Sequence, residues 1–509
     1  MVNKVNLRIC LTISIFLPVM AGQAQAATIT VGPGAGYDFD TIQAGIDAAV
    51  DGDTILVAAG EYVITEPITF RGKAITVKSE AGPDETTIRM GTPADTNRGS
   101  VIIFENGETT ASILEGFTIT GGVSSWVSYA NAYGGGGIYF DASSGSLINC
   151  AVVKNRADNG GGGGVSASYG SSPILSNCIF TGNSATLAGG GVLCYINSSM
   201  TMTDCIISGN SSLSLGGGVY GGSKSSITMT NCKIISNTVQ DAGAGIVCDS
   251  SSAILNNCVI AQNTGAKWGG GLCSGYPLSS ITISNCTIWG NSATEGGGVG
   301  CLNGGSVNVT NSILWENTAA RGNEIFLEES PTEFSVAFSN VAGGKAGAHV
   351  RGGSTLDWVT GNIDADPLFA DPNNDDFHLK SAAGRWDPNS KTWVLDDVTS
   401  PCIDAGDPNS DWTAELWPHG KWINMGAYGG TSQASRSLSD AGNVADLNRD
   451  GIVDSADMRI MVDHWGTDEP LCDIGPMPFG DGIVDVQDLI VLAEHLFEER
   501  EEGIKWLTK

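Results

Sequence analysis

Basic residues are scarce in this chain of 509 residues, which has 25 lysines and arginines against 55 aspartates and glutamates and a formal net charge of -30. Phosphate backbones recruit positively charged surfaces, so this balance argues against nucleic acid as a partner. Charged residues make up only 16% of the chain, whereas 70 residues are glycine. Such a composition is unusual for a helical enzyme and favours short strands joined by tight turns. The length predicts two or more domains.

The sequence also lacks a hydrophobic run long enough to span a membrane, which takes about 20 residues. The apolar residues 9–20 follow Lys4 and Arg8, and residues 24–26 have the small-x-small form of a cleavage site. This pattern is typical of an export signal. We therefore expect residues 1–26 to be a signal peptide. The mature chain is expected to be secreted, either extracellular or associated with the cell surface, without a membrane span.

The middle of the chain repeats about every 27 residues. An Asn-Cys pair, replaced once by Asp-Cys and at the end by Asn-Ser, recurs at steps of 28, 27, 27, 26, 28 and 26 residues. Another asparagine always stands five residues beyond the cysteine or serine. The pairs begin at Asn149, Asn177, Asp204, Asn231, Asn257, Asn285 and Asn311, and the later asparagines are Asn155, Asn183, Asn210, Asn237, Asn263, Asn291 and Asn317. Repetition at a fixed period indicates a solenoid.

Apolar residues alternate with polar ones on both sides of each pair. Leu147 and Met202 stand three residues before a cysteine, and Val152 and Ile207 stand two residues after one. Alternation marks half-buried strands, and its change of phase at the pair predicts a bend there. One coil cannot bury its own apolar face, but coils stacked about 4.8 Å apart can. We therefore predict a parallel β-helix, right-handed as such parallel connections are.

Glycine clusters separate these strands, and a hydrophobic residue such as Ile138 or Val299 follows each cluster. The clusters are residues 134–137, 160–164, 189–191, 216–218, 269–271 and 296–298. Glycine is needed where φ is positive or where coils approach closely. A phosphate-binding loop would need an adjacent Lys-Ser/Thr and a following helix, and both are missing. The clusters are therefore predicted to be structural turns.

Ten of the 13 cysteines fall at two positions of the repeat. Six belong to the Asn-Cys pairs, and the other four are Cys194, Cys248, Cys273 and Cys301. Stacked inward cysteines act as small apolar side chains, and parallel side chains give poor disulfide torsions. We favour ladders of buried free thiols over disulfides. The asparagines are expected to form ladders too, with amides bonded from coil to coil.

Motifs near the N-terminus point to a known superfamily. Residues 37–49 read YDFDTIQAGIDAA, residues 52–57 read GDTILV, and residues 114–122 read LEGFTITGG. Together with the glycine-rich repeat, they resemble the pectin-lyase-like β-helix superfamily over residues 28 to about 345. The resemblance implies an N-terminal cap in which a short amphipathic helix closes the stack. It is specific for the fold and not for an activity.

Residues 346–435 lose the period. They contain NIDADPLF, DFHL, SPCIDAGDP and NMGAYGG, beginning at residues 362, 376, 400 and 424. This stretch looks like the closing segment that follows the β-helix in large secreted bacterial proteins. We expect a polar cap over the last strand edges. A separate binding or catalytic role for its aspartates and tryptophans is the alternative.

Residues 446–457 have the spacing of a twelve-residue calcium loop. Gly451 allows the sharp turn at position 6, and the backbone carbonyl of Ile452 serves position 7. The side-chain ligands at positions 1, 3, 5, 9 and 12 are Asp446, Asn448, Asp450, Asp454 and Asp457. Hard Ca²⁺ prefers such carboxylate and amide oxygens. An amphipathic helix is predicted to follow over residues 458–465.

A second copy of the loop departs from this pattern. Asp481, Asp485 and Asp488 and the carbonyl of Ile483 match the first copy, and a helix is predicted from residue 489 to about 497. Met477 and Phe479 stand where positions 1 and 3 should supply oxygens, and Asp473 lies eight residues before Asp481 instead of four. Asp473 can serve as a ligand only through a longer loop.

Aspartate at position 12 and a single helix after each loop resemble a type I dockerin. The resemblance implies Ca²⁺ as cofactor and a cohesin-like partner. It also implies recognition through positions 10 and 11, which are Ser455-Ala456 and Val486-Gln487; these unlike pairs argue against two equivalent binding faces. The predicted fold is thus all-β, a right-handed parallel β-helix of about 27-residue coils over residues 27–345. A closing segment at 346–435 and a small α-helical dockerin-like domain at 436–500 follow it.

Catalytic signatures are missing from the coils. Residues 101–347 contain no histidine, and the coils have no Asp-Asp pair, whereas inverting glycosidases need two carboxylates about 6.5–9.5 Å apart. A lyase needs a basic residue beside a uronate carboxylate, but the basic residues do not share one position of the repeat: Lys154, Arg156, Lys224, Lys233, Lys267 and Arg321. Exposed turn residues are the favoured interpretation of Lys154 and Arg156. Catalytic residues therefore stay unassigned.

Two functional hypotheses follow. The first is a polysaccharide-associated protein that binds calcium and docks through its C-terminal module to a partner. The second is a polysaccharide-degrading enzyme, a pectate-lyase-like protein or a glycoside hydrolase, tethered by the same module. The fold alone does not decide between them.

Overall fold

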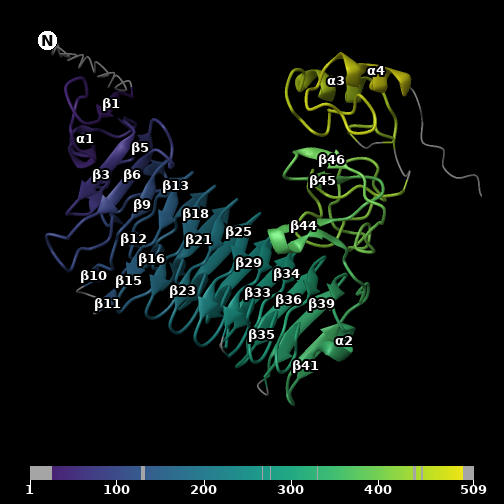
Figure 1. Cartoon of the computed structure of the whole chain (residues 1–509), viewed down its shortest axis with the longest axis horizontal. Coiled ribbons are helices and arrows are strands. Elements are labelled where there is room, and N and C mark those ends of the chain that lie inside the picture. The colour runs from purple at the N-terminus through teal and green to yellow at the C-terminus, as the bar shows by residue number, and fades with distance from the viewer. Residues whose placement is uncertain are drawn as a thin grey trace, which may run out of the picture.

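The computed structural model describes residues 26–127, 132–265, 267–275, 277–328, 331–439, 443–448 and 451–496. The predicted signal peptide, apart from Ala26, lies outside these residues. Parallel strands wind from residue 28 to residue 358 as a long solenoid (Figure 1). The predicted all-β, repeating architecture is confirmed. In the described residues, no helix is both long and apolar enough to cross a membrane.

Each coil between the two ends contributes one strand to each of three long parallel sheets. Sheet A consists of β1 (Thr28–Val31), β2 (Thr54–Val57), β5 (Thr76–Ser79), β8 (Ile113–Glu115), β13 (Ser146–Ile148), β17 (Ile174–Ser176), β21 (Ser199–Thr203), β25 (Ser226–Thr230), β29 (Ser252–Asn256), β33 (Ser280–Ser284), β36 (Ser306–Thr310), β39 (Glu333–Ala337) and β42 (Thr355–Trp358). Sheet B consists of β4 (Ile68–Thr69), β7 (Ile102–Phe104), β12 (Ile138–Asp141), β16 (Val165–Ser168), β20 (Val192–Cys194), β24 (Val219–Gly222), β28 (Ile246–Asp249), β32 (Leu272–Ser274), β35 (Val299–Cys301), β38 (Ile325–Leu327) and β41 (His349–Val350).

Sheet C follows sheet A in each coil. It consists of β3 (Gly60–Ile64), β6 (Thr86–Met90), β9 (Thr118–Thr120), β14 (Ala151–Val153), β18 (Ile179–Thr181), β22 (Ile206–Ser208), β26 (Lys233–Ile235), β30 (Val259–Ala261), β34 (Thr287–Trp289), β37 (Ile313–Trp315) and β40 (Asn340–Val341). A short fourth sheet consists of β15 (Arg156–Ala157), β19 (Ser184–Ala185), β23 (Ser211–Ser212), β27 (Thr238–Val239) and β31 (Thr264–Gly265). The hairpin β10 (Trp126–Val127) and β11 (Ala132–Tyr133) stands apart from these sheets.

The core is built from columns of identical positions. Leu147, Leu175, Met202 and Met229 pair in register on successive strands of sheet A, and all are fully buried. Burying one such side chain stabilises the fold by roughly 1.5–3 kcal/mol. At the N-terminal end, α1 (Ile42–Ala48) buries Ile42 and Ile46 against the first coils, as expected for the cap.

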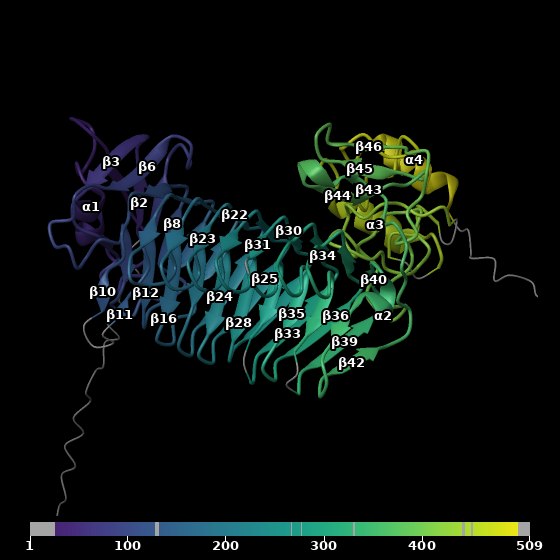
Figure 2. The same cartoon turned by 60° about the horizontal axis from the view of Figure 1, so that its bottom comes forward.

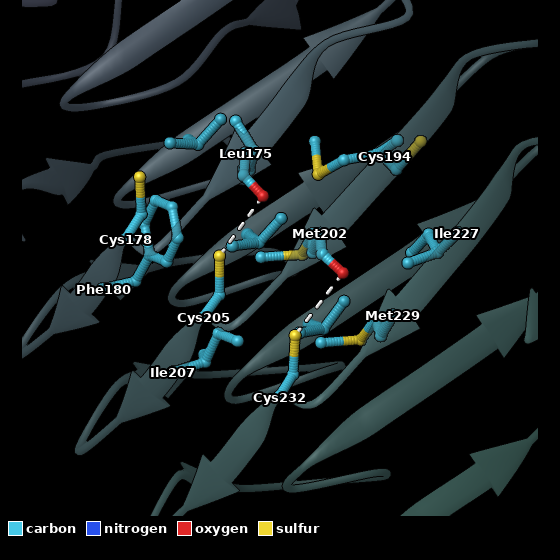
Figure 3. Packing of buried hydrophobic residues seen from close by; sticks show 14 of the residues in the cluster. Leu175, Cys178, Phe180, Cys194, Met202, Cys205, Ile207, Ile227, Met229 and Cys232 are labelled. Carbon is cyan, nitrogen blue, oxygen red and sulfur yellow. Dashed lines mark hydrogen bonds between the residues drawn. The ribbon is translucent and has the colours of Figure 1, made fainter. Parts of the chain in front are cut away.

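The predicted bend at the Asn-Cys pair is confirmed. The first residue of each Asn-Cys, Asp-Cys or Asn-Ser pair has a positive φ of 49° to 54°, a conformation that asparagine and aspartate tolerate well. The cysteine then points inward beside the sheet A column, where Cys205 Sγ lies 3.5 Å from the carbonyl oxygen of Leu175 (Figure 3). All 12 cysteines in the described residues are free and buried, so the thiol-ladder interpretation is confirmed.

The second asparagine of each repeat forms the other predicted ladder. The Nδ2 atom of Asn155 donates to Oδ1 of Asn183 at 3.2 Å, and the pattern continues coil by coil to Asn317. The glycine clusters pack directly beside it. A Cβ atom on Gly218 would lie 3.0 Å from the amide nitrogen of Asn237, which explains why the turn needs glycine.

The chain after β42 differs from the expected polar cap. The closing segment, residues 359–439, contains β43 (Phe369–Asp371), β44 (Asp376–Leu379), β45 (Arg385–Asp387), β46 (Thr392–Val394) and a 3-10 turn at Pro372–Asn374. It folds back along the outward face of sheet C (Figure 1). Trp289 packs there against Phe377, and Ile313 is buried in the same apolar cluster. Parallel pairing also continues past residue 345, to β42. The segment is thus an apolar side cover for the last coils.

The C-terminal module, residues 443–496, contains α3 (Ser455–Asp463) and α4 (Val486–Glu494). A small apolar core that includes Val453, Met461, Val484 and Leu492 holds the two helices together. The module lies next to β45 and β46 of the closing segment (Figure 2). One further short helix, α2 (Gly344–Gly347), joins β40 to β41.

Candidate functional site

A cleft of about 530 Å³ opens where the closing segment meets sheet C. One wall comes from the solenoid and includes Asp204, Asn231 and Lys233, and the other comes from the closing segment and includes Trp386 and Lys391. The two walls are therefore far apart in sequence, from Asp204 to Val259 and from His378 to Gln433, and meet only because the closing segment folds back. No catalytic set was assigned from sequence, and this cleft brings charged and aromatic residues of the solenoid and the closing segment together.

Asp204 enters the cleft from the turn between sheets A and C. It has the same left-handed conformation as the asparagines of its column, with φ of 54°. Three later members of that column hold the closing segment in place. Asn257 Nδ2 donates to the carbonyl of Gly429 at 2.8 Å, Asn285 Nδ2 donates to that of Asn424 at 3.1 Å, and Asn311 Nδ2 donates to the Ser410 hydroxyl at 2.9 Å. Asp204 is the carboxylate among the asparagines of this column, and it lies where the closing segment ends its contact with the solenoid.

Lys233 breaks a second column at the same place. It occupies the first outward position of sheet C, where a second charged residue, Glu61 of β3, stands at the N-terminal end and the other paired residues from β6 to β40 are uncharged: Thr87, Thr118, Ala151, Ile179, Ile206, Val259, Thr287, Ile313 and Asn340. Lys233 forms no ion pair within the described part of the chain, and its side chain is partly exposed. Two regular columns thus each place one charged residue in the cleft.

The closing-segment wall is rigid. Trp386 packs edge-to-face against Trp393, with ring centroids 5.9 Å apart. His378 stacks on Tyr428 at 3.6 Å, and its Nδ1 lies 2.6 Å from Asp376, which also pairs with Arg385 at 3.4 Å. Burial raises the pKa of the Tyr428 phenol. These packed rings fix the wall that carries Trp386 and Lys391.

The basic pair singled out from sequence lies elsewhere. Lys154 is an exposed residue of a turn with φ of 55°, and exposed Arg156 pairs with Asp158 at 2.8 Å. The interpretation as an exposed turn residue is confirmed for Lys154, whereas Arg156 is exposed but belongs to strand β15. Neither residue lines the cleft.

A second hollow, of about 340 Å³, lies at the edge of sheet B. Four tyrosines from successive coils line it, together with leucines of the facing turns: Tyr139, Tyr169, Tyr195 and Tyr220. The Tyr220 hydroxyl donates to Asp249 at 2.9 Å, and the rings of Tyr195 and Tyr220 lie 6.4 Å apart. This hollow is more apolar than the cleft and contains no lysine or arginine in its described lining.

The first predicted calcium loop has an ordered hydrogen-bond frame. Asp446 accepts from the N–H of Gly451 at 3.0 Å. Fully buried Asp457 accepts from the N–H groups of Asn448 and Asp454 at 3.0 and 2.9 Å, and Asp454 caps α3. The predicted ligand Asp450 lies outside the described residues. The carbonyl-bearing residue Ile452 lies in the loop, with its side chain exposed.

The second loop reproduces this frame through a longer route. Asp473 accepts from the N–H groups of Asp481 and Gly482 at 3.0 and 2.9 Å, the part that Asp446 plays in the first loop. Asp488 is fully buried and accepts from Ile474 and Asp485 at 2.6 Å each.

The remaining predicted residues of the second loop surround this frame. Asp485 caps α4, and the side chain of Ile483 is exposed. Gln487, predicted to contact a partner, donates to Asp481 at 2.8 Å. The longer loop thus brings Asp473 to the position that a standard spacing would give to residue 477.

The donor set of carboxylates, an amide and loop carbonyls suits a hard cation such as Ca²⁺. Among the described residues, however, no three acidic, histidine or cysteine side chains gather closely enough to hold a metal ion. Calcium binding therefore stays a prediction. Of the predicted partner-binding residues, Ser455, Ala456, Val486 and Gln487 are all exposed on the first turns of α3 and α4.

Residues 94–234 match the family model of the right-handed β-helix region. The predicted handedness is thereby confirmed. Residues 306–406 match a second family model, described as disaggregatase related. The two matches cover the first glycine-rich coils and the passage from the last coils into the closing segment, and residues 235–305 lie between them.

Solved structures with a similar fold include pectate lyase Pel9A, at 14% identity over 82% of this chain and 98% of that chain, with a TM-score of 0.40. A pectin methylesterase from carrot is 12% identical over 65% of this chain and 88% of that chain, with a TM-score of 0.33. The catalytic domain of a GH87 α-1,3-glucanase is 13% identical over 68% of this chain and 70% of that chain, with a TM-score of 0.28. No curated protein matches the sequence.

Sequence reasoning missed the cleft, although two signals were visible. Asp204 is the carboxylate in a column of asparagines, and Lys233 is the one charged residue of its column between β6 and β40. What the repeat could not reveal is that the aperiodic residues 359–439 fold sideways over sheet C and bring Trp386 and Lys391 opposite them.

Proposed function

We propose that this protein is an extracellular polysaccharide-binding β-helix protein that holds an acidic glycan in the cleft between sheet C and the closing segment. The observation that carries the proposal is the coincidence of two column-breaking charges, Asp204 and Lys233, in one open cleft. A structural role would not require either charge, since the neighbouring coils stack without them.

The chemistry of the cleft fits a sugar acid. Lys233 and Lys391 offer ammonium groups to a carboxylate, and charge-assisted hydrogen bonds of this kind are about twice as strong as neutral ones. Asp204 and Asn231 can bind hydroxyl groups, and the ring of Trp386 offers a flat apolar surface to a sugar face. The lysines are important because the chain as a whole carries a formal charge of -30 and repels polyanions elsewhere.

The C-terminal module completes the proposal. Its two loops are proposed to bind Ca²⁺, and its exposed helix starts are proposed to dock to a cohesin-like partner through Ser455, Ala456, Val486 and Gln487. The matched frames around Asp457 and Asp488 support two related loops. Bound calcium would neutralise the acidic loops and order them. A secreted protein with this organisation would deliver its β-helix to a surface or an assembly.

The alternative is a polysaccharide lyase, and the two cleft lysines favour it. In an elimination, a basic side chain removes the proton beside the uronate carboxylate, the bond from the sugar to the leaving oxygen breaks, and a double bond forms in the new chain end. The leaving oxygen takes up a proton. A neutral lysine could act as the base, while the second ammonium group neutralises the carboxylate.

The deciding experiment compares acidic and neutral polysaccharides in affinity electrophoresis and, in parallel, follows unsaturated uronide by ultraviolet absorbance. Lys233→Ala is expected to weaken retention by an acidic glycan at least tenfold, whereas Lys154→Ala, a lysine on the same solenoid but outside the cleft, should leave it unchanged. Absorbance that grows with time and vanishes in Lys233→Ala would establish the lyase. If Tyr195→Ala weakens retention and Lys233→Ala does not, the glycan binds in the tyrosine hollow, and the proposed binding site in the cleft is wrong.

A further inference from the structure

The two loops of the C-terminal module differ by an insertion in the second loop, and this insertion packs against the closing segment. Gly451 and Gly482, Asp454 and Asp485, and Asp457 and Asp488 are each separated by 31 residues. Asp446 and Asp473 are separated by only 27, so the second loop holds four extra residues between its first aspartate and its glycine. The extra length contains Met477 and Phe479, which replace the oxygen ligands of a regular loop.

Phe479 leaves the loop and packs against the closing segment. Its ring stacks on Trp393 with centroids 6.1 Å apart, and the guanidinium of Arg436 lies 4.8 Å from its centroid. The same guanidinium lies 4.2 Å from the Trp393 ring. Gly384 makes room for the contact, because a Cβ atom there would lie 2.8 Å from the Phe479 ring.

Arg436 ties the two parts together by a second contact. It is only 5% exposed, and its Nη1 donates to the carbonyl of Pro478, inside the insertion, at 2.8 Å. Burial lowers the pKa of Arg436 to about 10, and the carboxylate of Asp473 opposes this shift. On the other side, the Arg436 backbone is fixed by Gly384 and Ser381. A buried cation is costly when it is not paired. Among the described residues Arg436 forms no ion pair, and the Pro478 carbonyl and the rings of Trp393 and Phe479 are the groups that face its guanidinium.

We infer that the insertion in the second loop is an intramolecular clamp, in which Phe479 and Pro478 dock the C-terminal module onto Trp393 and Arg436 of the closing segment. The module is therefore held in one orientation on the β-helix and does not hang from a flexible linker. The loss of ligands at residues 477 and 479 is explained by this second role of the loop.

The clamp also determines which surface a partner can reach. The docked side includes the starts of both loops, since Asp446, Asp473, Leu416 and Arg436 line one small cavity between the module and the closing segment. The helices carry the exposed apolar side chains: Val486 is 56% exposed and Ile490 is 54% exposed. On α3 the equivalent positions are Ser455 and Arg459. Val462 of α3 is also exposed, at 58%. The clamp thus leaves apolar side chains of both helices accessible to a partner protein, a consequence that rests on the docking role proposed above.

Hydrogen exchange and small-angle scattering of the full chain test the clamp, using Phe479→Ala and its matched control Met477→Ala, four residues from Asp473 but 47% exposed. Phe479→Ala is expected to speed amide exchange at least tenfold in residues 384–396 and 473–480 and to increase the radius of gyration. Met477→Ala should do neither. Trp393→Ala, on the opposite side of the contact, should reproduce the effect of Phe479→Ala.

Equal exchange and equal scattering for Phe479→Ala, Trp393→Ala and the unaltered chain would overturn the clamp. The measurement is made with calcium and again with a chelator. A module that binds no calcium but still shows the Phe479 effect would refute the calcium proposal and keep the clamp. If the module binds calcium but the scattering shows that it moves freely relative to the β-helix, the calcium proposal is kept and the clamp is refuted.

Discussion

The buried carboxylate of Glu324 accepts both the backbone N–H of Asn317, at 3.2 Å, and its side-chain amide, at 2.5 Å. Asn317 is the last member of the asparagine ladder, and every earlier member is bonded in the same two ways by the asparagine of the next coil. Glu324 therefore ends the ladder in place of a further asparagine. Burial raises its pKa to about 8, although the bonds from Asn317 oppose the shift.

Stability of the last coils should consequently fall as the pH rises. Because the pKa of Glu324 is higher in the folded than in the unfolded chain, the folded state binds more protons between about pH 4.5 and pH 8. The contribution is fully present below pH 4.5 and is lost as the pH rises through 8, with a slope of at most about 1.4 kcal/mol per pH unit. Urea unfolding at several pH values measures it. Glu324→Gln should flatten the profile, and an unchanged profile would contradict this assignment.

The ladder itself should be sensitive to a single truncation. Asn237 is fully buried, donates to Ile207 and Asn263, and accepts from the N–H of Asn210. Asn237→Ala leaves these partners unsatisfied, at about 1–3 kcal/mol for each buried group. We expect a large drop in the free energy of unfolding, measured by urea denaturation. Thr238→Ala, at the adjacent exposed position, should change it by less than about 0.5 kcal/mol.

The cysteine ladders should be chemically silent in the folded protein. Burial raises the pKa of the Cys194 and Cys248 thiols to about 12, and thiolate is the reactive form. An aromatic disulfide reagent should label none of the 12 described cysteines under native conditions and all of them in urea. If even two thiols were labelled rapidly in the folded protein, the coils would have to open, or the cysteine side chains would not point into the core.

The β-helix could be predicted from sequence because its signals are local and repeated. The Asn-Cys pair shows where the strands bend, the alternation around it shows which side chains point inward, and the glycines show the turns. The cleft could not be predicted in this way, since Trp386 and Lys391 come from an aperiodic stretch, and only tertiary packing brings them into the same cleft as Lys233. The expectation of a polar cap was wrong for the same reason: the apolar outward residues Trp289 and Ile313 needed a cover.

Within the cleft, Asp204→Asn is the mildest informative change. It restores the residue type of the column, keeps the left-handed turn and removes one negative charge. Stability should stay within about 0.5 kcal/mol, as for other surface substitutions. If Asp204 binds glycan hydroxyls, retention in affinity electrophoresis should weaken several-fold. If the retained glycan is purely polyanionic and Asp204 makes no contact with it, removing the charge would instead strengthen retention, which would contradict the role given to this residue.

Calcium should stabilise the C-terminal module through the two aspartates at position 1. A ligand at 100 times its dissociation constant stabilises the folded state by about 2.7 kcal/mol, so a chelator should lower the melting temperature of the module and leave the coils unaffected. Asp446→Ala should remove most of the calcium-dependent shift, because this residue begins the loop with regular spacing. Asp473→Ala should remove a smaller part, since its loop is longer and lacks oxygens at residues 477 and 479. Asp463→Asn, at the exposed end of α3, is the matched charge control. Calorimetric titration that gives the same calcium binding for Asp446→Ala as for the unaltered chain would refute the first loop as a metal site.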